Sequence, residues 1–175
     1  MKVRFLSAFL LCFIACGRYV KPVPPEALAP EAVKDFQAVF AADGVSFNWK
    51  SSERDSRGKP LQSLEEYRIY RKELNLEDSS IFSREGYFLI STLGDKHLPL
   101  LLKLQMEARK DGKSPRNVQV PKDLLLFTFK DTGLIPGITY SYRIIGVNQN
   151  GVESDSDRVV KVLFNGNDSE LIVIR

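Results

Sequence analysis

The chain has 175 residues, of which 43% are hydrophobic and 27% are charged. This composition is typical of a globular protein that buries a core, and the length suits one domain with additions rather than two domains. The formal net charge is +3, and two of the positive charges belong to Lys2 and Arg4 at the start. The rest of the chain is therefore close to neutral, which argues against a nucleic-acid partner.

Both cysteines, Cys12 and Cys16, lie near the start of the chain. The body of the protein therefore has no thiol, which excludes disulfides, thiolate catalysis and cysteine metal ligands from the folded part.

The N-terminal segment has the character of a secretory signal. Lys2 and Arg4 precede an almost wholly apolar run, Phe5 to Ala15. The run is shorter than the roughly 20 residues that a membrane-spanning helix needs, and it fits the apolar core of a signal peptide.

The end of this run, Phe13-Ile14-Ala15-Cys16, resembles the bacterial lipobox, although Phe13 stands where leucine is usual. The resemblance implies that residues 1–15 are a lipoprotein signal peptide and that Cys16 becomes an acylated N-terminus, carrying diacylglycerol and a fatty acid such as palmitate. More than one acyl chain gives stable anchoring. Gly17, by analogy with enterobacterial sorting, indicates the outer membrane of the cell envelope, facing the periplasm or the surface. An uncleaved anchor, or a signal peptide with an incidental cysteine, remains the alternative.

Residues 16–30 are expected to form the lipidated N-terminus and a tether. Prolines fix φ and disfavour helix in the residue before them, so this segment, with Pro22, Pro24, Pro25 and Pro30, predicts a stiff spacer. We expect it to hold the folded domain, residues 31–175, away from the membrane.

The folded part is dominated by short apolar or alternating segments separated by turn residues, a pattern typical of a β-sandwich. The expected strands are 33–40, 45–49, 67–71, 86–90, 124–129, 139–147 and 158–164.

One stretch, Asp131 to Ile144, resembles the corner between strands E and F of a fibronectin type III domain. The residues that carry the resemblance are Leu134, Pro136, Gly137 and Tyr140, together with Trp49 at the position of the family's strand B tryptophan. The resemblance implies an all-β, Ig-like sandwich in which the Tyr140 hydroxyl bonds to the chain just upstream.

Residues 93–123 form an insertion where that family has a short link between strands C′ and E. The lack of β-branched residues in 98–109 favours a helix, whereas the alternation from Leu102 to Arg109 favours a hairpin; we prefer the helix. The insertion is either a partner-binding element or a flap that covers a sheet edge. The candidate partner-binding residues, which would face an anionic surface, are Lys103, Arg109, Lys110, Lys113 and Arg116.

The C-terminus is expected to add a further strand. Asn165-Gly166 is a strong hairpin signal, and Leu171 to Ile174 is an apolar segment that follows it. This strand either pairs within the domain or offers a docking edge.

Catalytic and metal-binding patterns are absent from the sequence. His97 is the one histidine, so a metal centre or a Ser-His-Asp set would rest on a single residue. No phosphate-binding or dinucleotide-binding glycine pattern is present. We therefore expect no catalytic residues, no metal and no cofactor.

These features predict a membrane-anchored, non-catalytic lipoprotein that acts as a protein-interaction module and binds another envelope protein. A module that binds peptidoglycan or another envelope glycan is the alternative. The sequence leaves the oligomeric state open.

Overall fold

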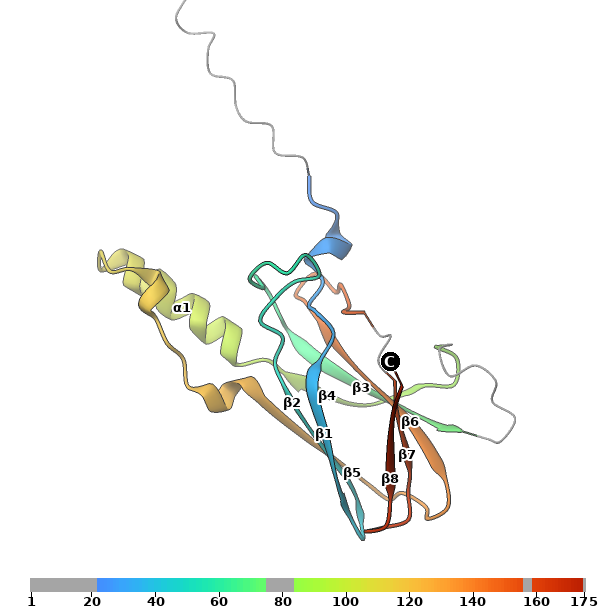
Figure 1. The fold of residues 1–175 in the computed structure, drawn as a ribbon. Helices are drawn as coiled ribbons and strands as arrows, with labels where there is room; N and C mark the ends of the chain where they lie inside the picture. Colours follow the sequence, from blue (N-terminus) through green and yellow to red (C-terminus); the bar gives the residue numbers. More distant parts are fainter. Residues whose placement is uncertain (1–21, 75–83, 156–158, 175) are drawn as a thin grey trace, which may run out of the picture.

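The computed structural model describes residues 22–74, 84–155 and 159–174, and its strands form two antiparallel sheets (Figure 1). One sheet has three strands in the order β1-β2-β5, and the other has five in the order β4-β3-β6-β7-β8. The strands are β1 (Lys34–Ala41), β2 (Gly44–Lys50), β3 (Glu66–Leu74), β4 (Phe88–Gly94), β5 (Leu126–Thr132), β6 (Thr139–Val147), β7 (Val159–Leu163) and β8 (Glu170–Ile174).

This arrangement is a fibronectin type III-like β-sandwich, as the sequence predicts. Strands β1, β2 and β5 take the places of strands A, B and E, and β4, β3, β6 and β7 those of C′, C, F and G. The helix α1 (His97–Lys110) lies in the connection from β4 to β5, and β8 is added beyond β7. The described residues also include three short 3₁₀ turns: η2 (Pro25–Leu28), η3 (Pro115–Asn117) and η4 (Lys122–Leu125).

Strand β2 shows why the alternating pattern specifies a sandwich. Val45, Phe47 and Trp49 are buried, whereas Ser46 and Asn48 between them are partly exposed. Successive side chains of a strand point to opposite faces, so the apolar set of β2 faces the other sheet. Strand β6 differs, because residues on both of its faces are buried.

The centre of the core is a cluster of three aromatic rings that joins the two sheets. Trp49 on β2 stacks on Phe127 on β5, with ring centroids 5.6 Å apart. Tyr67 on β3, from the other sheet, contacts both rings edge-on at 5.7 and 4.8 Å. Each buried ring contributes on the order of 1.5–3 kcal/mol to the free energy of folding. This cluster therefore stabilises the contact between the sheets in the absence of a disulfide.

A buried polar network forms a second link between the sheets. The Arg71 guanidinium on β3 donates to both carboxylate oxygens of Asp131 on β5, at 3.0 Å each. The Tyr142 hydroxyl on β6 donates to the same carboxylate at 2.7 Å, and Asp131 is only 7% exposed. Burial alone would lower the pKa of Arg71, but the Asp131 carboxylate outweighs it and raises that pKa.

The turn before β6 has the geometry that the fibronectin resemblance implies. The Tyr140 hydroxyl accepts a hydrogen bond of 3.0 Å from the backbone N–H of Ile135. Gly137 adopts a φ of +83°, a conformation that favours glycine, and its N–H donates to the carbonyl of Phe164 at 2.8 Å. The corner is thereby tied to the end of β7.

Several boundaries differ from the sequence-based expectation, and residues 124–125, expected in a strand, belong to η4. Strand β4 continues to Gly94, because Leu93 pairs with Tyr67 of β3, so the insertion begins after Gly94 rather than at Leu93. The last residues of the expected tether also pack on the domain: the carbonyl of Leu28 accepts from Asn148 at 3.3 Å, and that of Ala29 from the N–H of Ser56 at 2.9 Å.

We predict that Tyr142→Phe destabilises the fold by about 1.5–3 kcal/mol, because it removes a hydrogen bond to a buried carboxylate. Burial, followed by the hydrogen bond to Asp131, raises the pKa of Tyr142. A raised pKa means that this stabilisation is complete below the ordinary tyrosine value of about 10 and is lost as the pH rises further.

Urea unfolding at pH 7 and at about pH 10.5 tests both statements, since the alkaline loss should be smaller in Tyr142→Phe than in the parent. Tyr140→Phe is the comparison, because its hydroxyl bonds a neutral backbone donor instead of a carboxylate. Equal stability of Tyr142→Phe and the parent at pH 7 would contradict the proposed link.

Candidate interaction surfaces

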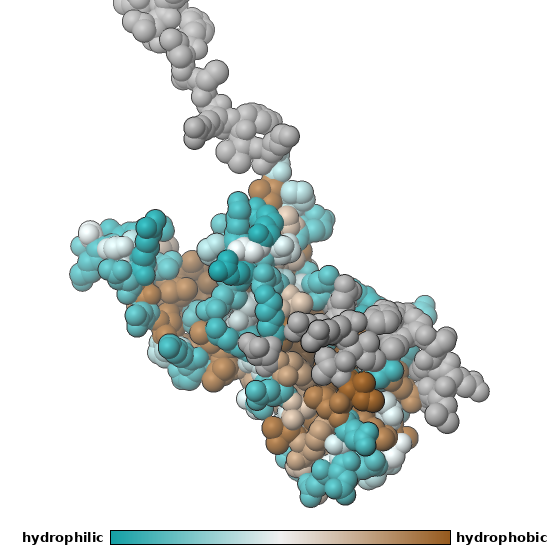
Figure 2. Space-filling model, in the orientation of Figure 1, coloured by the Kyte–Doolittle hydropathy of each residue, from teal (hydrophilic) through white to brown (hydrophobic). Residues whose placement is uncertain are grey.

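The insertion forms an arm, residues 97–122, that leaves the sandwich as α1 and returns through η3 and η4 to β5 (Figure 1). The expected helix is confirmed, and the alternative hairpin is wrong. At the base of the arm Leu98 is buried in the core and Leu101 packs against it. Figure 2 shows apolar surface where the arm joins the sandwich and hydrophilic surface at the tip.

Asp95 fixes the start of α1. Its carboxylate accepts hydrogen bonds from the backbone N–H groups of His97 at 3.3 Å and Leu98 at 2.8 Å, which have no partner within the helix. Its own N–H donates to the carbonyl of Glu65 at 2.8 Å, so the helix start is held to the sandwich. Burial raises the pKa of Asp95, and the two backbone donors only partly oppose this effect.

The outer face of α1 combines apolar and cationic side chains. Leu102 is 39% exposed and Met106, one turn later, is 56% exposed. At about 100° per residue, Arg109 lies on one side of this pair, and Lys103 and Lys110 lie on the other. All three cationic residues are exposed.

All five candidate partner-binding residues lie on the arm and are exposed. Lys103, Arg109 and Lys110 are on α1, Lys113 follows it, and Arg116 is in η3. Lys113 forms an ion pair with Asp111 at 3.3 Å, with both side chains largely in solvent. An ion pair this exposed holds its partners weakly, so the Lys113 charge remains available to a partner.

The edge strand β8 is a second candidate surface. It pairs with β7 in unbroken register from Glu170 to Ile174 and, among the described strands, has no neighbour on its other side. Ile172 is 51% exposed. Edge strands are usually protected by charges, prolines or bulges, and the sequence from Leu171 to Ile174 has neither a charge nor a proline.

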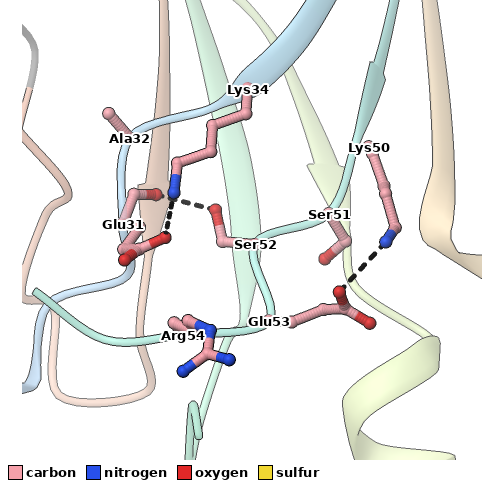
Figure 3. A pocket seen from close by; sticks show the side chains of 8 residues that line it. All are labelled: Glu31, Ala32, Lys34, Lys50, Ser51, Ser52, Glu53 and Arg54. Atoms are coloured by element: carbon pink, nitrogen blue, oxygen red, sulfur yellow. Dashed lines mark hydrogen bonds and ion pairs between the residues drawn. The ribbon is translucent and has the colours of Figure 1, made fainter. Parts of the chain in front are cut away.

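A polar pocket of about 180 Å³ lies at the end of the sandwich near β1 and β2 (Figure 3). Lys34 pairs with Glu31 at 2.6 Å and Lys50 with Glu53 at 3.0 Å. The Ser52 hydroxyl donates to the carbonyl of Glu31 rather than to a base. Arg54, the third cationic residue of the lining, donates to the carbonyl of Gly58 at 2.6 Å. Both lysines are therefore paired within the pocket, and Ser52 is not an activated nucleophile.

A smaller cavity, about 100 Å³, lies on the outer face of the five-stranded sheet. The Arg143 guanidinium, 4% exposed, lies 4.6 Å from the centre of the Tyr87 ring. Arg84 and Glu153 at its rim form an ion pair at 3.0 Å. The sequence does not indicate this cavity, because alternation within β6 does not show that Tyr87 covers Arg143.

Among the residues that the structure describes, no group of three or more histidine, cysteine, aspartate or glutamate residues is placed to hold a metal ion. Within the same residues, no helix is long and apolar enough to cross a membrane. His97 is half-buried at the first position of α1.

Comparisons with known proteins return structural similarity alone. No protein-family model matches the sequence, and a search of curated proteins gives no match. The third fibronectin III domain of the human KIAA0343 protein is 16% identical, with a TM-score of 0.41, over 86% of this chain and 93% of that one. The twitchin kinase region of C. elegans is 19% identical, with a TM-score of 0.39, over 80% of this chain and 17% of that one.

We predict that Asp95→Ala destabilises the start of α1 by about 1 kcal/mol, because two helical N–H groups lose their acceptor. Asp95→Asn should be at least as stable as the parent at pH 7. A carboxyl with a raised pKa stabilises fully below its ordinary value of about 3.9 and loses this contribution as the pH rises, whereas asparagine caps without a charge.

Hydrogen exchange of the amides of residues 97–101 and urea unfolding measure these effects. Faster exchange in Asp95→Asn than in Asp95→Ala at pH 7 would contradict the capping role.

Proposed function

We propose that this protein is a lipid-anchored, non-catalytic module of the bacterial cell envelope that binds another envelope protein along the β8 edge. The observation that carries the proposal is the unprotected edge of the five-stranded sheet. An extended segment of a partner adds to such an edge through backbone hydrogen bonds, and pockets for alternate side chains give specificity.

The other sheet edges support the choice of β8. Strand β1 has a register shift between Lys34 and Gln37, and the β3–β4 pairing shifts at Ile69. Strand β5 carries the exposed Lys130, which pairs with Asp43 at 2.7 Å. These features discourage strand addition, whereas β8 pairs in unbroken register and carries a charge only at its first residue, Glu170.

The proposed anchor at Cys16 would favour the same function by confining the module to a membrane. A module confined to a membrane meets a partner in that membrane at a raised effective concentration, so a modest edge affinity suffices. The proline-containing segment before η2 sets the distance between the acyl chains and the sandwich.

The glycan-binding alternative has less support. Sugar recognition would use a flat patch of exposed aromatic rings. Among the described residues, only one aromatic side chain is largely exposed, that of Phe88 on β4, at 73%. A single ring does not form such a patch.

We predict that a photo-reactive residue in place of Glu170 cross-links to one envelope protein in the native cells, and that adding Ile172→Lys abolishes the adduct. A charge at this edge position opposes strand addition. The control is the same photo-reactive residue at Val39, which is 56% exposed on β1.

Equal adducts from Val39 and Glu170, or adducts that persist with Ile172→Lys, would contradict docking at β8. An adduct with twice the mass of the chain would mean that β8 binds a second copy of this protein instead of another envelope protein.

We predict that the native protein incorporates labelled palmitate and partitions with membranes, and that Cys16→Ser abolishes the label. Cys12→Ser is the matched control and should retain the label, because that residue lies within the signal peptide. Label that survives Cys16→Ser would refute the anchor.

A further inference from the structure

We propose that the arm, residues 97–122, lies on the anionic lipid surface of the membrane that holds the acyl chains of Cys16. This inference rests on the proposed anchor and adds a second membrane contact, which would fix the orientation of the sandwich.

The charge of the protein is concentrated on the arm. Glu107 and Asp111 are the acidic residues of 97–122, which have a net charge of +4; Asp123, the next residue of η4, lowers it to +3 for residues 97–125. The whole chain carries +3, so all the residues outside 97–122 together carry −1. The basic residues of the arm are Lys103, Arg109, Lys110, Lys113, Arg116 and Lys122.

The outer face of α1 has the pattern of a helix that lies in a lipid interface. Such helices place apolar side chains between basic ones, so that the apolar part enters the headgroup region while the cations contact lipid phosphates. Leu102 and Met106 form the apolar part, and both are exposed. Because the apolar area is small, electrostatic attraction must supply most of the binding.

The direction of the arm fits this contact. In Figure 1 the tip of the arm rises to the same end of the molecule as η2, the first described element after the anchor region. The position of η2 on the sandwich is fixed, because the carbonyl of Glu26 accepts from the Ser56 hydroxyl at 3.2 Å and that of Leu28 from Asn148 at 3.3 Å. The chain therefore leaves toward the membrane from the end where the cations lie.

A lipid surface fits these cations better than an acidic protein. Lys103 and Lys110 are seven positions apart, about 10 Å along the helix, and both are exposed. Four of the six basic residues are lysines, which act as flexible point charges rather than as planar bidentate donors. A fluid surface of many phosphates matches such a spread, and each basic residue near it strengthens binding about five-fold.

The test uses the full-length native protein with Met106→Cys, labelled with an environment-sensitive dye and reconstituted into vesicles. Two vesicle compositions are compared: phosphatidylcholine alone, and phosphatidylcholine with roughly 30% anionic phosphatidylglycerol. Val39→Cys, on β1, is the matched control position, because Val39 and Met106 are equally exposed at 56%.

We expect blue-shifted emission at position 106 in the vesicles that contain phosphatidylglycerol, and not in phosphatidylcholine alone or at position 39. Salt at about 1 M should abolish the shift, because the screening length falls to about 3 Å. Lys110→Glu, Lys113→Glu and Arg116→Glu together should weaken the contact by at least about 100-fold, because each change removes a positive charge and adds a negative one. Lys72→Glu, Lys130→Glu and Lys161→Glu, the same charge change on strands β3, β5 and β7 of the sandwich, should leave it intact.

Unshifted emission at position 106 in both kinds of vesicle overturns the proposal. An acidic protein would then be the better candidate partner for the arm. A shift of equal size in both compositions, or at position 39, overturns it as well. The number of dyes per chain reports on the anchor separately: one dye is expected when residues 1–15 are removed and Cys16 is acylated, and further dyes mean that the anchor itself is wrong.

Discussion

The structure depends on side-chain contact between two sheets that no disulfide joins, because both cysteines, Cys12 and Cys16, precede the described residues. Trp49 and Phe127 from the three-stranded sheet meet Tyr67 from the five-stranded sheet in one aromatic cluster. Asp131, held by Arg71 and Tyr142, adds a polar link between the same sheets. A buried ion pair adds less to stability than its contacts suggest, but it is costly to break, so it favours one alignment of the sheets.

The two candidate interaction surfaces, β8 and the arm, lie outside this core. Strand β8 is added beyond the strand that completes the sandwich, and the arm is inserted between β4 and β5. Apart from its first turn, where Leu98 enters the core, the arm contributes little to the packing of the sheets. Additions that the fold does not need for its core are where interactions can be gained without loss of stability. In the proposed account they have separate tasks: the arm contacts lipid, and β8 contacts protein.

The sequence predicts the parts of this structure that local chemistry determines. The turn from Leu134 to Tyr140 requires a glycine with positive φ and a tyrosine at fixed spacing, and both are readable in the sequence. Asn165-Gly166 similarly indicates the hairpin between β7 and β8.

Contacts between residues distant in the sequence were not predictable. Alternation places Arg71 on the core face beside Ile69, but nothing in the sequence shows that Asp131, 60 residues later, is its partner. The secondary structure of the arm was ambiguous, because the alternation from Leu102 to Arg109 fits a strand. The capping contact of Asp95, which favours the helix, depends on its burial against Glu65.

Hydrogen–deuterium exchange of the native lipidated protein would test the central claim, that anchor and arm together orient the sandwich on the membrane. The protein would be compared in neutral detergent and on bilayers of phosphatidylethanolamine and phosphatidylglycerol. The account predicts that the bilayer slows exchange in α1 and in the turn that follows it, while the amides of β8 exchange as in detergent. Unchanged exchange in the arm, or slowed exchange in β8 on bilayers without a protein partner, would contradict it.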